Sequence, residues 1–294
     1  MTEVASAAGF GSIRRFNETF QQLYGRPPKA IRRTRVAEES ADTTGAVSVK
    51  LGYRPPYDWG AILSFLRARA IPGIEAVSSG RYVRTIAIGD KHGLLIVEPA
   101  ERNCLKAIVR FPNLRNLPAI IARVRRVFDL AADPLAIDAH LSQDPVLASF
   151  VATRPGLRVP GAWDGFELAV RAILGQQITV PAAARLLGKL VLSYGEKISD
   201  PVALDQGLTH VFPTPQKLAG IDLTAIGMPK ARRIALSALA AAVVADPLIF
   251  GPRRSLEEAI AQLRSLAGSA NGQLSTSQCV NCASRMPFRR PISG

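Results

Sequence analysis

The sequence has few acidic side chains, few cysteines and no long apolar run, and each shortage excludes a class of protein. It holds 23 Asp and Glu against 37 Lys and Arg, a formal net charge of +14. This balance favours a polyanionic partner, nucleic acid first and an acidic membrane surface second. No apolar run approaches the roughly 20 residues that cross a bilayer, and the N-terminus carries no signal-peptide stretch. We therefore expect a cytoplasmic protein that is not membrane-bound.

The three cysteines are too few for a disulfide framework, which suits a reducing compartment. Cys279 and Cys282 form a single C-x-x-C, which lacks the second ligand pair of a structural zinc site. The three histidines are scattered, with no carboxylate at catalytic spacing. The sequence therefore predicts no metal site.

Arg158 to Tyr194 is the most strongly patterned stretch of the chain. Two amphipathic helical patterns are joined by Gly175-Gln176-Gln177, and Pro181 suits the first turn of the second helix. The polar break is either an ordinary helix connection or a loop that points out of the core. Asp164 and Glu167 fall at the start of the first helix, where we expect them to stabilise its N-terminus.

Residues 1–35 have the pattern of a helix-turn-helix. A Gly9-Phe10-Gly11 break precedes a helix for which Ser12 is the predicted N-cap. The outer face of that helix offers base-edge and phosphate contacts through Ser12, Arg14, Arg15 and Asn17. The stretch resembles the second helix-turn-helix of AraC-type regulators, which carry two such units. The resemblance implies that the chain starts inside the second unit and that this partial reading head binds DNA weakly.

Residues 36–48 read as a linker, and residues 49–118 as a small α+β subdomain. In that subdomain a helix with Ile62, Leu63, Phe65 and Leu66 on its apolar positions precedes three predicted strands. These strands are Tyr82 to Ile88, Gly93 to Glu98 and Leu105 to Phe111, the first two joined by a hairpin turn. A further amphipathic helix contains Ile120, Val124 and Phe128.

Five collinear blocks between residues 49 and 267 resemble DNA glycosylases of the DNA-3-methyladenine glycosylase II family: LGYRPPYDWGAILSFLRARAIPGIE, FDLAADP, RPGLRVPGAWDGFELAVRAILGQQ, FPTPQKLA and IGMPKARR. The resemblance implies a mainly α protein with an α+β N-terminal subdomain, followed by a helical glycosylase domain of the helix-hairpin-helix type at residues 119–267. It also implies a monomer that binds double-stranded DNA containing alkylated bases and needs no metal or organic cofactor. A glycosylase behind an AraC-type module is similar to bacterial bifunctional regulator and repair proteins.

The resemblance also implies functional positions. Cleavage of a glycosidic bond needs a carboxylate beside the developing positive charge, and the base must first leave the stack. Gln177, next to Gln176, falls at the position that wedges into the duplex, where the family's best-known pattern has leucine. Phe65 matches an aromatic near the base pocket, although it also fits the core of its own helix. No catalytic residue is assigned, because the family's aspartate is absent.

Residues 268–294 depart from the family, and we expect an aberrant, disordered tail there. The family supplies a hairpin and the catalytic aspartate at this point, whereas Ser269 to Gly294 contains no acidic residue. One permitted set of codons from Gly268 onward, read from its third base, gives IGKWTAQYIAMRELREPDAFPASDIG. That string holds the family's hairpin and aspartate segment in order. We therefore expect a frameshift at or just before Gly268 and a truncated, catalytically inactive glycosylase.

Two alternatives remain open at this stage. The chain is either a DNA-binding fragment of a transcription regulator, acting through its N-terminal helix-turn-helix, or a non-functional product of a frameshifted gene. Its net charge predicts residual nonspecific DNA binding in each case, with a place at the bacterial nucleoid.

Overall fold

The computed structural model describes residues 14, 18 and 46–250, and the chain divides into two units, residues 1–46 and 47–294. In the first unit Arg14 and Glu18 are helical and exposed, and Arg14 Nε lies 3.0 Å from Glu18 Oε1. The predicted contact residues Ser12, Arg15 and Asn17 lie outside the described residues. No helix among residues 14, 18 and 46–250 is long and apolar enough to span a membrane.

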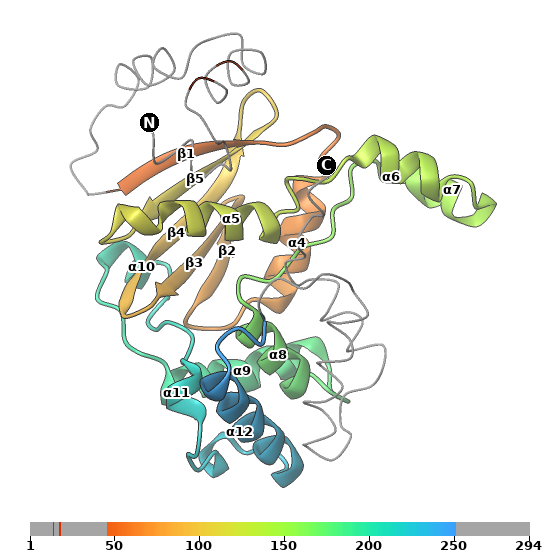
Figure 1. Cartoon of the computed structure of the whole chain (residues 1–294). Coiled ribbons are helices and arrows are strands. Elements are labelled where there is room, and N and C mark those ends of the chain that lie inside the picture. Colours follow the sequence, from red (N-terminus) through yellow and green to blue (C-terminus); the bar gives the residue numbers. More distant parts are fainter. Residues whose placement is uncertain (1–13, 15–17, 19–45, 251–294) are drawn as a thin grey trace. The chain divides into compact units, whose positions relative to one another are not determined.

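The second unit begins with a five-stranded sheet in the order β1-β5-β4-β3-β2 (Figure 1). The strands are β1 (Ala46–Gly52), β2 (Glu75–Ser78), β3 (Arg81–Ile88), β4 (Lys91–Ala100) and β5 (Cys104–Arg110), and β2 to β5 pair antiparallel in sequence order. The three predicted strands are β3, β4 and β5. Strand β1, which begins within the expected linker 36–48, and the four-residue β2 were not predicted.

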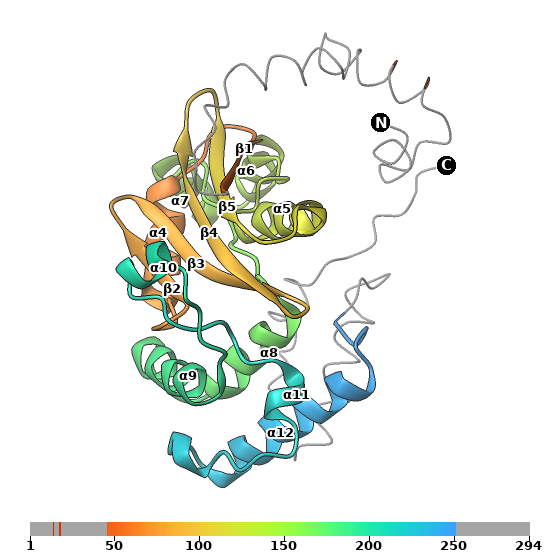
Figure 2. The same ribbon diagram turned by 90° about the vertical axis from the view of Figure 1, so that its left-hand side faces the viewer.

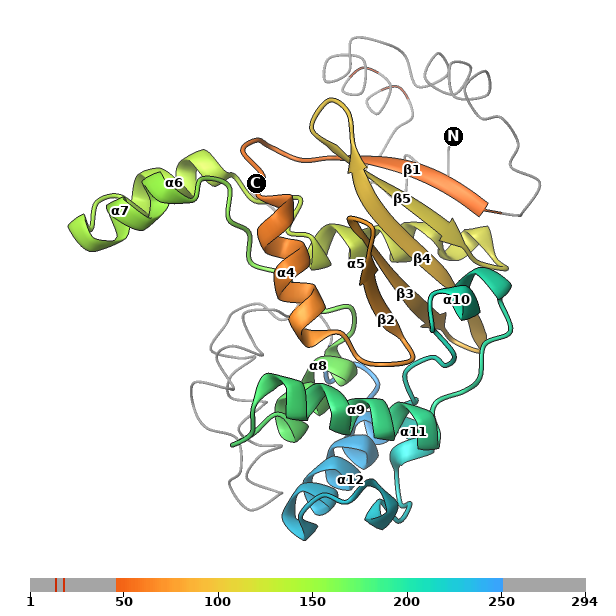
Figure 3. The same cartoon turned by 180° about the vertical axis from the view of Figure 1, so that it is seen from behind.

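Helices cover both faces of the sheet. Leu51, Ile86 and Val109 pack with α4 (Trp59–Arg69) and α5 (Leu117–Val127) in one buried cluster. On the other face, Val83 and Leu94 pack against α10 (Pro201–Asp205) (Figure 3). Ile120, Val124 and Phe128 belong to the same buried cluster as these sheet residues.

A second core joins the helices beyond one end of the sheet (Figure 2). It is built from α8 (Gly165–Leu174), α9 (Val180–Tyr194), α11 (Pro215–Leu218) and α12 (Lys230–Ala245), with η2 (Thr224–Ile226) beside them. The predicted helix pair of Arg158 to Tyr194 is α8 and α9. Asp164 caps α8 by accepting hydrogen bonds from Phe166 N and Glu167 N, and Thr179 caps α9 in the same way, as side chains at N-caps do.

The helical hairpin of α6 (Pro134–Leu141) and α7 (Pro145–Thr153) projects from the sheet subdomain (Figures 1 and 3). Earlier in the chain, the short 3-10 helix η1 (Leu114–Asn116) leads into α5. The hairpin exposes Leu135, Val146 and Phe150, each more than 60 % accessible. Residues 134–153 contain no Lys or Arg, so this apolar surface is also free of positive charge in a chain of net charge +14.

Position 93 has no room for a side chain, because β4 lies close against the end of β5 there. A Cβ at Gly93 would lie 2.2 Å from Arg110 O and 2.7 Å from the Phe111 ring, while a Cβ at Gly52 would meet nothing within 4 Å. We expect Gly93→Ala to lower the free energy of unfolding by about 1–3 kcal/mol, because the strands must separate locally. Gly52→Ala is the matched control and should change it by less than about 0.5 kcal/mol. Urea denaturation measures both, and equal stabilities would contradict the prediction.

Candidate functional site

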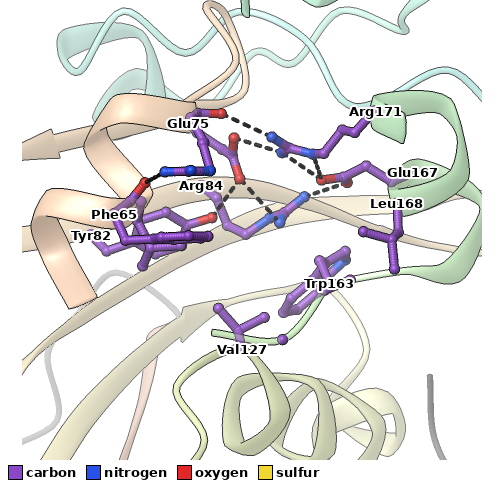
Figure 4. Close-up of a pocket in the computed structure, with 13 residues that line it drawn as sticks. Phe65, Glu75, Tyr82, Arg84, Val127, Trp163, Glu167, Leu168 and Arg171 are labelled. Atoms are coloured by element: carbon purple, nitrogen blue, oxygen red, sulfur yellow. Dashed lines mark hydrogen bonds and ion pairs between the residues drawn. The ribbon is translucent and has the colours of Figure 1, made fainter. Parts of the chain in front are cut away.

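Four charged side chains meet in the interior, where the sheet subdomain contacts α8. Arg84 on β3 shares the inward face of its strand with Tyr82 and Ile86, while Glu75 begins β2 and Glu167 and Arg171 lie one turn apart on α8. Figure 4 shows the two guanidinium groups pointing between the two carboxylates. Arg84 and Glu167 are 3 % and 4 % exposed, so this buried ion cluster is nearly closed to water.

The buried ion cluster alternates positive and negative groups. Arg84 donates to Glu167 Oε2 at 2.8 Å and to Glu75 Oε1 at 3.4 Å. Arg171 donates to Glu75 Oε2 and Glu167 Oε1, both at 2.7 Å, and to Arg69 O at 2.9 Å. Two arginines and two glutamates leave no net charge, which is the condition under which buried charges are tolerated.

The Glu75 carboxylate also accepts from two neutral donors. Tyr82 Oη donates to Glu75 Oε1 at 2.7 Å, and the backbone N of Ile71 donates to Glu75 Oε2 at 2.9 Å. Burial alone would raise the pKa of Glu167, but the charges of Arg84 and Arg171 outweigh it and hold that pKa at about 2. Glu167 is therefore ionised, and both carboxylates are bonded, so neither is free to act on a substrate.

A small hollow opens beside the buried ion cluster and is lined by aromatic and aliphatic side chains. Phe65 lines it from α4 and Trp163 from the segment before α8 (Figure 4). The Arg84 guanidinium lies 4.7 Å from the Trp163 ring, and the Arg69 guanidinium lies 3.8 Å from the Phe65 ring, both within cation–π range. Phe65 is half-buried here, on the rim of the hydrophobic core.

The polar break between α8 and α9 has two glutamines in different environments. Gln177 is exposed and holds a left-handed φ of 56°, a conformation uncommon for a residue with a side chain. Gln176 is 6 % exposed, and its backbone O accepts a hydrogen bond from Arg232 on α12. The side-chain Nε2 of Gln176 is buried without a partner among the described residues. The loop is thus anchored at Gln176 and presents Gln177 to solvent.

Helix α8 connects the buried ion cluster with the polar break Gly175-Gln176-Gln177. Its first turns hold Glu167 and Arg171 against the sheet subdomain, and its C-terminal end leads directly into Gly175 and the glutamines. Phe65 lines the hollow at the start of α8, so it lies beside the same helix as Gln177, at the opposite end.

The structure corrects one sequence-based interpretation. Glu167 was expected to stabilise the N-terminus of its helix, but its carboxylate bonds Arg84 and Arg171 instead. Asp164 alone performs the expected capping. The sequence analysis also missed Arg84, Glu75 and Trp163. Charged residues within otherwise apolar strand and helix patterns, such as Arg84 between Val83 and Ile86, were the available signal for a buried ion pair.

Among residues 14, 18 and 46–250, no three His, Cys, Asp or Glu side chains are grouped as metal ligands. Trp163 is 5 % exposed, and the Arg84 and Arg123 guanidinium groups lie over its ring, so half-buried Phe65 is the more accessible aromatic side chain of the hollow.

Comparison with known proteins identifies the fold and its relatives. The family model of the AlkA N-terminal domain matches residues 48–164. The chain is 37 % identical over 268 residues to the "Probable bifunctional transcriptional activator/DNA repair enzyme AlkA" of Mycobacterium tuberculosis, covering 90 % of this chain and 53 % of that protein. It is 36 % identical over 223 residues to "DNA-3-methyladenine glycosylase 2" of Escherichia coli, covering 74 % of this chain and 75 % of that protein.

A solved structure agrees in fold. The 3-methyladenine DNA-glycosylase from Archaeoglobus fulgidus superposes with a TM-score of 0.65 at 19 % identity, over 79 % of this chain and 78 % of that one. The sheet subdomain followed by a helical region is thus the architecture of the helix-hairpin-helix DNA glycosylases. Within that class the chain belongs to the AlkA family of DNA-3-methyladenine glycosylases. It spans about half the length of the mycobacterial relatives it matches.

The ion cluster makes stability depend on acid pH. The folded-state pKa of Glu167, about 2, lies below its ordinary 4.5, so its contribution is complete above pH 4.5 and is lost as pH falls towards 2. We expect Glu167→Gln to cost about 3–5 kcal/mol at pH 7, because two buried arginines lose a carboxylate. The difference from the unmodified chain should shrink between pH 4.5 and 2, as followed by urea denaturation.

Glu196→Gln is the control for that measurement, because Glu196 is 54 % exposed and pairs only at the surface with Lys217 and His92. Its stability should follow the unmodified chain at each pH. A Glu167→Gln variant with the same stability as Glu196→Gln at pH 7 would show that the cluster contributes nothing to folding.

Proposed function

We propose that this chain carries the DNA-engaging part of an alkylated-base glycosylase and that it releases no base itself. The family supports the first half, since the E. coli relative is named a DNA-3-methyladenine glycosylase. The observation that supports engagement of DNA is the geometry of the α8–α9 loop. Gln177 is exposed there at φ 56°, while Arg232 anchors the neighbouring Gln176. A pre-set, projecting polar side chain suits entry into a duplex at the position of a displaced base.

In this proposal Gln177 fills the gap and Phe65 offers aromatic surface to the displaced base. The positive charge of the chain attracts the duplex before the loop engages it. An amide stacks less well than an apolar side chain, so the wedge holds the base out for a shorter time than leucine would. In this proposal the duplex opens before any chemistry, and its opening does not depend on cleavage of the glycosidic bond.

The second half of the proposal concerns the reaction. Cleavage of the glycosidic bond needs a carboxylate that faces the sugar. Within residues 46–250, Glu75 and Glu167 are committed to arginines, and Asp164 caps α8. Residues 268–294 contain no Asp or Glu, whereas a shifted reading of permitted codons restores the family's hairpin and aspartate segment. A frameshift at or just before Gly268 therefore accounts for a glycosylase that engages DNA without cutting the bond.

A second candidate function is regulation through the N-terminal unit. The mycobacterial relatives are named as transcriptional activators as well as repair enzymes, and they align with 90 % of this chain. Residues 47–294 number 248, about 84 % of 294, so part of the aligned stretch falls within residues 1–46. Ser12, Arg14, Arg15 and Asn17 are the residues proposed to contact DNA there. DNA binding by a helix-turn-helix at the bacterial nucleoid, as a monomer in the cytoplasm, fits this role.

We expect no release of 3-methyladenine from methylated duplex DNA by this chain. Chromatography of released bases measures it, with the E. coli relative as the positive control. Correction of the gene by the single nucleotide that restores the alternative frame at Gly268 should raise release by at least about a thousandfold. Release by the uncorrected chain at the level of the E. coli enzyme would refute the proposal, as would gene codons that do not encode the alternative string.

We expect Gln177→Ala to abolish duplex opening while leaving most of the electrostatic binding. A duplex with 2-aminopurine beside a methylated base should brighten when the unmodified chain unstacks it, and Gln177→Leu should brighten it at least as much. Gln177→Ala should not. Ser193→Ala, at the exposed far end of α9, is the matched control. Unchanged fluorescence response in Gln177→Ala would assign the loop to an ordinary helix connection.

A further inference from the structure

A second hollow lies on the sheet subdomain, formed by different residues from those beside α8. It is lined by the exit of β1, the β4–β5 turn, the last turn of α5 and the segment before α6. Arginines reach it from three of these four segments. We name it the arginine hollow and define it by Tyr53, Arg54, Arg102, Asn103, Arg125 and Asp133.

The charges of the arginine hollow are not balanced. Its only carboxylate, Asp133, pairs with Arg54 through Oδ2 and caps α6 by accepting from Ala136 N through Oδ1. Arg102 and Arg125 are exposed and form no ion pair within residues 46–250. Two guanidinium groups therefore face the hollow with their charge uncompensated, in contrast to the buried ion cluster, where every arginine is matched by a glutamate.

The walls of the arginine hollow are held in place by a buried side chain. Arg158, 6 % exposed, donates to Ala132 O at 3.2 Å and Pro56 O at 3.0 Å, and it also donates to Arg54 O. It thus ties the segment after β1 to the segment before α6. Its guanidinium also lies 4.9 Å from the Tyr57 ring. A binding surface whose frame is fixed in advance loses less entropy when a ligand arrives.

The β4–β5 turn is fixed in the same way. Arg102 and Asn103 both have left-handed φ values, 60° and 54°, and Asn103 O accepts a hydrogen bond from Tyr53 N at 3.0 Å. This bond joins the turn to the exit of β1. The Tyr53 ring, 4.4 Å from that of Tyr57, is half-buried and lines the hollow beside the guanidinium groups.

We propose that the arginine hollow binds a phosphate group. Guanidinium groups form paired, charge-assisted hydrogen bonds with phosphate oxygens, and Arg102 and Arg125 have the free donors for them. Tyr53 supplies an aromatic surface and Asn103 an amide next to that phosphate, which matches the chemistry of a nucleotide. The phosphate belongs either to a free nucleotide or to a DNA strand outside the lesion. The site shares no residue with the α8–α9 loop, so it stands or falls separately from the proposed function.

The test removes the two unpaired charges. Arg102→Ala/Arg125→Ala is compared with Arg67→Ala/Arg115→Ala, which deletes the same charge from exposed arginines outside the hollow. Calorimetric titration with inorganic phosphate and with dAMP probes the free ligand. Fluorescence anisotropy with an undamaged duplex, at several salt concentrations, probes the strand. Thermal melting checks that both variants keep the stability of the unmodified chain, as expected for exposed side chains.

Saturable binding of phosphate or dAMP that weakens at least about tenfold only in Arg102→Ala/Arg125→Ala assigns a free phosphate ligand. Absence of that binding, with a salt slope for DNA that falls by about two only in the same variant, assigns a DNA phosphate. Equal behaviour of the two double variants with all three probes overturns the proposal. That result would neither support nor contradict the proposed opening of the duplex by Gln177.

Discussion

The contact of Arg84 with Glu167 is the interaction on which the rest of the second unit depends. It links the middle of β3 to the first turn of α8 through the interior, at 2.8 Å, and Arg171 and Glu75 close the ring. Such a cluster gives little net stability compared with an apolar core, but loss of one member leaves an unpaired buried charge. It therefore specifies one relative placement of sheet and α8, and that placement positions both the aromatic hollow and the glutamine loop.

Much of this fold could be predicted from the sequence because its apolar periodicity is strong. Strands β3 to β5 and the pair α8 and α9 have clean patterns, and Asp164 and Thr179 signal where the helices begin. Strand β2, with four residues, is too short to show a period, and β1 follows a stretch of small polar residues. Glu167 was misinterpreted because position in a helix is local information, whereas its partner Arg84 lies 83 residues away.

The candidate site, like the fold, could be predicted from the sequence only in part. The resemblance of whole sequence blocks predicts Gln177 and Phe65 as site residues, and the structure adds their setting: one is exposed at a left-handed φ, and the other lines a hollow. The role of Trp163 was not predictable, since its neighbours Arg84 and Arg123 come from other elements. Likewise, the arginine hollow brings together residues 53–54, 102–103, 125 and 133, and no local pattern indicates that they meet.

Because the hairpin of α6 and α7 exposes apolar side chains, salt affects both the attraction of this protein to polyanions and the interaction between its copies. Low salt favours attraction of the basic chain to polyanions and keeps the copies apart, because like charges repel over about 10 Å at 0.1 M. High salt removes that repulsion while leaving intact the attraction between exposed Leu135, Val146 and Phe150 on neighbouring molecules. The same change in the buffer thus weakens both the attraction to polyanions and the repulsion between copies.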